Sequence, residues 1–67
     1  MKLQVGDLVQ HVDHPDIMGT VIMVATTNKG SDVCKVVINY NKNFPENIGK
    51  TRYLNQCYWR KLELPSN

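Results

Sequence analysis

The spacing of apolar side chains predicts short β-strands and no long helix. Residues 8–12 and 19–27 are short runs rich in β-branched or other apolar side chains, bounded by Gly, Pro and Asp. Residues 33–40 alternate between two faces, as a strand does. The face that we expect in the core carries Cys34, Val36, Ile38 and Tyr40. Residues 28–32 supply the turn of a β-hairpin, in which Gly30 can adopt a positive φ.

The second half of the chain predicts a loop and two further strands. Residues 41–49 lack periodicity and contain a proline and a glycine, so they predict a loop that is long for so small a protein. Long loops of this kind often carry a binding site. A fourth strand is expected at residues 50–54, a tight helical turn at 55–58, and a short closing strand at 60–64 that stops at Pro65.

Five short strands in 67 residues predict one all-β domain that covers residues 1–67. A small, strongly bent barrel is the simplest way to cover both faces of these strands and to limit exposed edges. Hydrophobic residues make up 42% and charged residues 21% of the chain, which is an ordinary globular composition. A core of this size supplies about 3–5 kcal/mol, so an elaborate buried active site is not expected.

Two short motifs carry a resemblance to a known group of folds. The segment Val5-Gly6-Asp7-Leu8-Val9, followed by Gly19-Thr20-Val21, resembles the start of small SH3-like barrels of the Tudor and KOW type. The resemblance implies a five-stranded barrel with a one-turn helix before the last strand, matched here by residues 55–58 and 62–64. In KOW-type modules, basic and aromatic loop residues contact RNA or a polymerase partner.

No set of side chains predicts catalysis or a bound metal. His11 and His14 stand beside Asp13 and Asp16, and imidazole with carboxylate is a sensible zinc or nickel set. Residues three apart on an extended strand point to opposite faces, so we expect no metal site there. Asp7 follows a glycine, where such a residue accepts hydrogen bonds from backbone N–H groups of a turn. We therefore expect no enzyme, no catalytic residue and no cofactor.

The ends and the cysteines suggest a soluble cytoplasmic protein with no membrane partner. No apolar run is long enough for a signal peptide or for the roughly 20 residues of a membrane span. Cys34 and Cys57 then predict free, buried thiols, with a single disulfide as the alternative. The size and simplicity of the chain suit a bacterial or phage accessory protein.

The candidate binding residues come mostly from one basic and aromatic segment. The net charge of +2 is too mild to demand nucleic acid, but residues 50–61 contain no Asp or Glu. Tyr58 and Trp59 are adjacent, so alternation predicts one in the core and one at the surface. The candidate binding residues are Phe44, Lys50, Arg52, Tyr53, Tyr58, Trp59, Arg60 and Lys61.

Three hypotheses for function remain open at this point. The first is a protein-interaction module that binds an unidentified protein partner through the loop around Phe44-Pro45 and an exposed strand edge. The second is binding of RNA or single-stranded DNA through residues 50–61, where aromatic side chains lie among positive charges. The third is a structural protein that self-associates through its β edges into a homo-oligomer.

Overall fold

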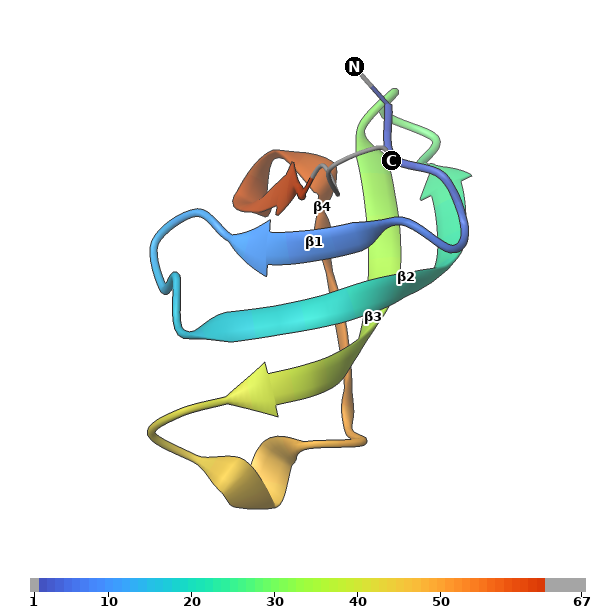
Figure 1. Ribbon diagram of the computed structural model, residues 1–67. Coiled ribbons are helices and arrows are strands. Elements are labelled where there is room, and N and C mark those ends of the chain that lie inside the picture. The colour runs from blue at the N-terminus through green and yellow to red at the C-terminus, as the bar shows by residue number, and fades with distance from the viewer. Residues whose placement is uncertain (1, 63–67) are drawn as a thin grey trace, which may run out of the picture.

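A computed structural model describes residues 2–62 as a single antiparallel sheet of five strands (Figure 1). The strands are β1 (Leu8–His11), β2 (Ile17–Thr26), β3 (Asp32–Asn41), β4 (Thr51–Asn55) and β5 (Trp59–Lys61). Their order in the sheet is β4-β3-β2-β1-β5. Two single 3₁₀ turns complete the fold, η1 (Pro45–Asn47) and η2 (Gln56–Tyr58). The all-β class and the one-turn helix before the last strand are therefore confirmed.

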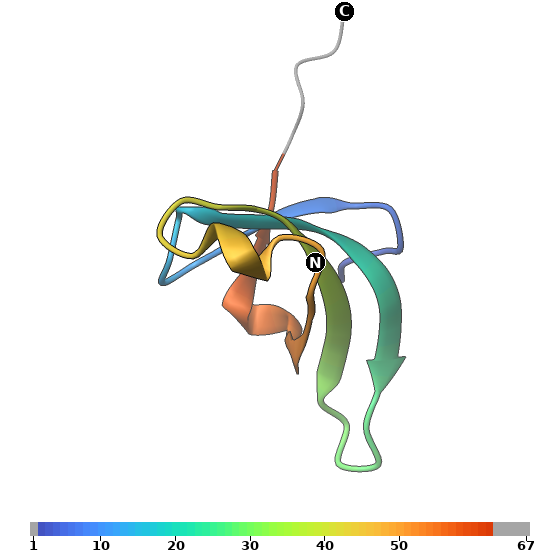
Figure 2. The same ribbon diagram turned by 90° about the horizontal axis from the view of Figure 1, so that it is seen from below.

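The sheet bends because its two longest strands each carry a bulge. One extra residue, Asn39, lies in β3 between the pairs Met18↔Tyr40 and Gly19↔Ile38. A second extra residue, Ile22, lies in β2 between Val21↔Val36 and Met23↔Lys35. A bulge bends the strand and increases its twist. Figure 2 shows the result, since β2 curves through the molecule and reaches β1 with its first half.

The bulge in β3 also changes which side chains face the core. Cys34, Val36 and Ile38 are buried, as the alternation predicts. The same pattern places Tyr40 in the core, which is wrong, since Tyr40 is 44% exposed. Asn39 interrupts the alternation, so the next inward position is Asn41, which is 4% exposed.

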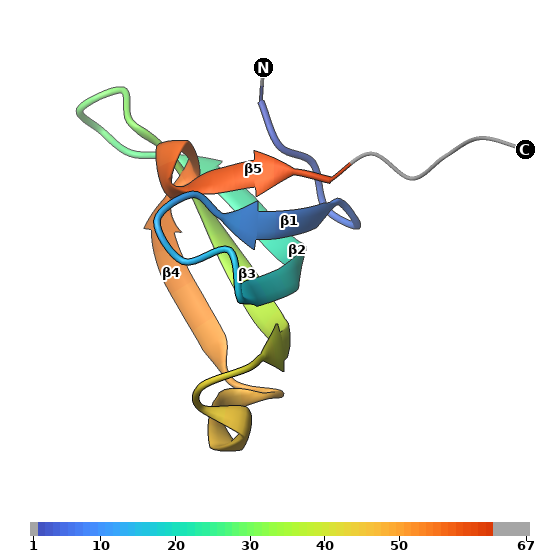
Figure 3. The ribbon, with the colours of Figure 1, turned by 60° about the vertical axis from the view of Figure 1, so that its left-hand side comes forward.

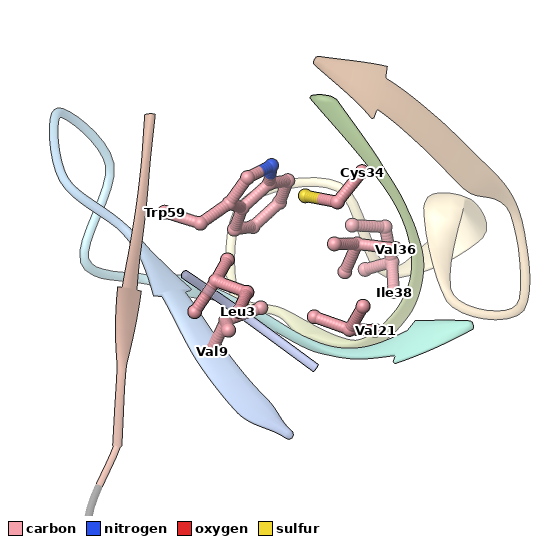
Figure 4. Close-up of a cluster of buried hydrophobic side chains, with 7 residues drawn as sticks. All are labelled: Leu3, Val9, Val21, Cys34, Val36, Ile38 and Trp59. Atoms are coloured by element: carbon pink, nitrogen blue, oxygen red, sulfur yellow. The ribbon is translucent and has the colours of Figure 1, made fainter. Parts of the chain in front are cut away.

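The core is a cluster of seven buried side chains enclosed by the bent sheet (Figure 4). Its members are Leu3, Val9, Val21, Cys34, Val36, Ile38 and Trp59. Leu3 precedes the first strand, and its N–H donates to the Oε1 of Gln56 at 2.8 Å. Trp59 is 5% exposed and Tyr58 is 41% exposed, so the prediction of one core and one surface aromatic is confirmed.

The bent sheet is open along one side. Within residues 2–62, β4 pairs only with β3 and β5 only with β1, although η2 connects β4 directly to β5. In Figure 3, β4 and β5 form the two ends of the bent sheet. The bend thus covers the core without pairing the two edge strands. A closed barrel would leave no edge strand exposed, whereas this sheet keeps two, β4 and β5.

Most predicted boundaries lie within two residues of the observed ones. The predicted loop at residues 41–49 contains η1, and the hairpin turn has Gly30 at φ 83°, as expected. The last residues of the closing strand predicted at 60–64, with Pro65, lie outside the described residues. Among residues 2–62 there is no helix long and apolar enough to cross a membrane.

Replacing Gly19 by alanine should destabilise the fold strongly. A Cβ at this position would overlap the carbonyl oxygen of Val37 and the side chain of Val36. Because backbone cannot move aside cheaply, we expect a loss of about 3 kcal/mol in the free energy of unfolding, measured with urea. The control is Gly30→Ala, which meets open space and is penalised only by its positive φ, by about 1 kcal/mol. Equal losses would contradict the steric argument.

Truncating the two neighbouring aromatic residues should have opposite consequences. Trp59→Ala removes the largest side chain of the core cluster and should cost about 3–5 kcal/mol, enough to leave the chain largely unfolded. Tyr58→Ala removes an exposed ring and should leave the fold intact. Amide dispersion in the NMR spectrum measures both outcomes. A folded Trp59→Ala variant would show that the core does not depend on the indole.

Candidate functional site

A hollow in the surface lies between the β1–β2 loop and the β3–β4 loop. We call this hollow the loop cleft, and its volume is about 570 Å³. One wall is formed by residues 13–17, and the opposite wall includes Phe44 and Asn47. The strands between these walls contribute His11, Arg52, Leu54 and Trp59. The cleft therefore combines side chains from both halves of the sequence.

Strand alternation in β4 decides which of its side chains reach the loop cleft. Arg52 lies opposite Val36, and Leu54 lies opposite Cys34. Both partners are buried in the core, so Arg52 and Leu54 point to the concave side of the sheet. Tyr53 lies opposite Lys35 and faces the outer side, where it is 53% exposed.

His11 ends β1 at the centre of an aromatic group beside the cleft. Its ring centroid lies 5.0 Å from that of His14 and 5.2 Å from that of Trp59, which it meets edge-on. Its Nδ1 accepts a hydrogen bond from the N–H of Asp13 at 3.1 Å. Burial lowers the pKa of His11, and the neighbouring His14 lowers it further, followed by Arg52, while Asp13 opposes the shift. Burial therefore favours the neutral ring, and because Nδ1 accepts a hydrogen bond, the proton of that neutral ring lies on Nε2.

The placement of the two histidines corrects a prediction from the sequence. His11 and His14 do not point to opposite faces, because β1 ends at His11 and the chain turns before His14. The extended geometry behind that prediction applies only within a strand. Within residues 2–62, no three His, Cys, Asp or Glu side chains are grouped so that they could hold a metal ion.

Hydrogen bonds fix the walls of the loop cleft. The amide of Gln10 donates to the carbonyl oxygen of Pro15 at 2.9 Å, which ties the β1–β2 loop to its own strand. On the other wall, the buried Asn41 accepts through Oδ1 from the N–H of Phe44 at 3.1 Å. The N–H of Lys42 donates to the carbonyl of Asp16 at 3.4 Å and links the two walls.

The structure distributes the candidate binding residues over several surfaces. Phe44, Arg52 and Trp59 line the loop cleft, and Tyr58 stacks near His11 with ring centroids 6.1 Å apart. The other four lie elsewhere. They are Tyr53 on the outer face, the exposed Lys50 before β4, Arg60 and Lys61. Arg60 donates through Nη2 to the Oε1 of Gln10 at 3.3 Å, and the Nζ of Lys61 forms an ion pair with the Oδ1 of Asp7 at 3.6 Å.

Of the thirteen residues that line the cleft, only Phe44, Arg52 and Trp59 were among the candidate binding residues, and His11 and Asn41 show why others were missed. His11 was visible only as part of a metal motif, and its adjacent aromatic residues come from the far end of the chain. Asn41 gave no signal, because it reaches the cleft only through the bulge at Asn39. Contacts between distant segments and shifts of strand register are not encoded in local periodicity.

A second hollow, of about 530 Å³, lies on the other side of Trp59, beside Gln56 and Cys57. Both cysteines are free, as predicted. Cys57 is nevertheless exposed, which corrects the expectation of a buried thiol, because the predicted helical turn, η2, has no buried residue. Cys34 is buried, and burial raises the pKa of its thiol.

At the first turn, the Oδ2 of Asp7 accepts a hydrogen bond from the N–H of Gln4 at 2.8 Å, as expected.

The chemistry of the loop cleft suits binding of a partly apolar ligand that carries hydrogen-bond acceptors. Phe44, Leu54 and Trp59 offer apolar surface, and the Arg52 guanidinium offers five N–H donors. The Oδ1 of Asn41 is used within the loop, whereas no hydrogen bond within residues 2–62 engages its NH₂ group, which can donate to a ligand. No protein-family model matches this chain, and neither a curated protein nor a solved structure matches it.

The free energy of unfolding should fall as the pH drops below about 6.5, and His11 should be a main cause. The pKa of His11 is lower in the folded than in the unfolded chain, so protonation favours the unfolded state. The stabilisation that neutral His11 gives to the fold is complete above the pKa of His11 in the unfolded chain. It is lost as the pH falls through the lower pKa of His11 in the folded chain. Urea unfolding at about pH 7.5 and about pH 5.5 measures the loss.

The variant His11→Asn should reduce this pH dependence, because it keeps an acceptor for the Asp13 N–H and removes the titrating ring. The matched control is His14→Asn, which removes only the smaller of the two main causes and should keep most of the dependence. An unchanged pH dependence in His11→Asn would contradict the assignment.

Proposed function

We propose that the chain is a non-enzymatic binding module that holds a segment of a partner protein in the loop cleft. The observation that carries this proposal is the cleft itself, in which apolar side chains lie beside Arg52 between two hydrogen-bonded loops. Ligand sites are typically concave and mostly apolar, with few well-placed polar groups. A cleft that is open on one side suits an extended peptide.

Two features of the cleft suggest what the partner segment contains. Within residues 2–62, no hydrogen bond or ion pair engages the Arg52 guanidinium, so it is available to a carboxylate or carbonyl of the ligand. Phe44 is 55% exposed, which leaves its ring free to pack against an apolar side chain. The partner segment should therefore place an apolar residue near an acceptor.

The proposed function includes a fold assignment of the SH3-like kind. The strand order β4-β3-β2-β1-β5, with η2 before β5, is compatible with a small barrel. The resemblance of Val5-Gly6-Asp7-Leu8-Val9 to the Tudor and KOW type is further support. Because folds of this kind host unrelated functions, the choice of partner rests on the cleft rather than on the fold.

Nucleic-acid binding is the second candidate. Lys50 and Arg52 precede Tyr53 in the sequence, and Lys35 of β3 lies opposite Tyr53, so three cations and an aromatic ring lie in or next to the β3–β4 pair. Against it, Lys61 is paired with Asp7 and Arg60 lies on the other edge strand. Binding to a short oligothymidylate that weakens steeply with salt would favour this candidate over the first.

Selection from a random peptide display library tests the proposed function. The wild-type protein should enrich peptides that share an apolar residue near an acidic one, and these should shift the amide signals of the two cleft walls. Phe44→Ala and Arg52→Ala should each weaken binding about tenfold, while the matched control Arg60→Ala should leave it unchanged. If no sequence is enriched, or if the shifted amides lie outside the walls, the proposal is wrong.

A further inference from the structure

The two edge strands of the open sheet differ in how well they are protected. β5 is three residues long and carries Arg60 and Lys61, and short charged edges resist pairing with another chain. β4 is five residues long, has no proline, and keeps one register with β3 along its whole length. Figure 3 shows β4 at the margin of the molecule, with its far side free of other strands.

The register of β4 shows which of its backbone groups are free. The N–H of Ile38 donates to the carbonyl of Lys50 at 2.8 Å, which marks a hydrogen-bonded position. Because such positions alternate in an antiparallel ladder, Arg52 and Leu54 bond to β3 in turn. The N–H and C=O groups of the alternate residues therefore point to the free edge. These residues are Thr51, Tyr53 and Asn55, except that the C=O of Asn55 accepts the first hydrogen bond of η2 and only its N–H is free.

We propose that two copies of this chain pair antiparallel through β4, with Tyr53 on the two-fold axis. In this register Tyr53 faces Tyr53 of the second copy, and Thr51 faces Asn55. The two copies of Tyr53 exchange two N–H···O=C bonds, and the free N–H of Asn55 donates to the C=O of Thr51 in the second copy, so the ladder continues across the interface. The proposal does not rest on the proposed function, although Arg52 and Leu54 of β4 also line the loop cleft.

The side chains of β4 are complementary to themselves in this arrangement. Arg52 faces Leu54 of the second copy on the concave side, so no two like charges are opposed. On the outer side, the two Tyr53 rings form a cross-strand aromatic pair, and each is 53% exposed in the single chain. A second copy thus gives hydrogen-bond partners to the free backbone groups of β4 and covers the exposed Tyr53 ring.

Sedimentation velocity over a range of concentrations tests the interface. The wild-type protein should change from monomer to dimer as concentration rises. Tyr53→Pro removes an N–H that the β3 ladder does not use, so the variant should fold but stay monomeric. The matched control Tyr53→Thr keeps the N–H and introduces a β-branched side chain that favours a strand, so it should still dimerise.

A mixed NMR sample gives a measurement that does not depend on the proline variant. A spin label on the exposed Cys57 of unlabelled protein should broaden amide signals near residues 49–51 of an isotope-labelled copy, because Thr51 faces Asn55 in the proposed register and η2, which carries Cys57, directly follows Asn55. A wild-type monomer at every concentration would overturn the proposal. Equal dimerisation of the two Tyr53 variants, or broadening confined to β5, would also overturn it.

Discussion

The close approach of the β2 backbone to β3 at Gly19 is the constraint on which the rest of the structure depends. Gly19 is paired on one side with Val9 of β1 and on the other with Ile38 of β3. No side chain fits there, since a Cβ would overlap the Val37 carbonyl. The bulge next to this pair bends the sheet, and the bend gathers Val9, Ile38 and Trp59 into one core cluster. A flat sheet of this length would leave both faces in water.

Trp59 completes the core by its volume rather than by its polar group. The indole Nε1 is buried and has no hydrogen-bond partner within residues 2–62. In Figure 4 this nitrogen lies on the side of the ring turned away from Leu3 and Val9. A buried donor without a partner costs about 1–3 kcal/mol, whereas burying a large aromatic ring contributes several times the stabilisation of a methylene group. The ring therefore fills the core of a sheet whose two edge strands, β4 and β5, are not paired with each other.

The sequence predicted the strands because each is a compact run between turn residues, but it did not predict how they bend. Cys34, Val36 and Ile38 follow strict alternation, so their burial was predictable. Tyr40 was misplaced because the bulge at Asn39 depends on the pairing with β2, which no local pattern encodes. The candidate site was predicted in part for the same reason. Phe44 and Arg52 stand out by type, whereas the cleft that joins them to His11 depends on the tertiary fold.

β4 connects the two proposed binding surfaces because its neighbouring side chains face opposite sides. Arg52 and Leu54 face the loop cleft, and Tyr53 between them faces outward at the free edge. Adjacent positions therefore report on different surfaces, although they lie on the same five-residue strand. In the antiparallel pair, Arg52 of one copy would lie beside Leu54 of the other, so the two clefts would share a concave face. A ligand that contacts both copies would then favour the dimer, and dimerisation would favour that ligand by the same free energy.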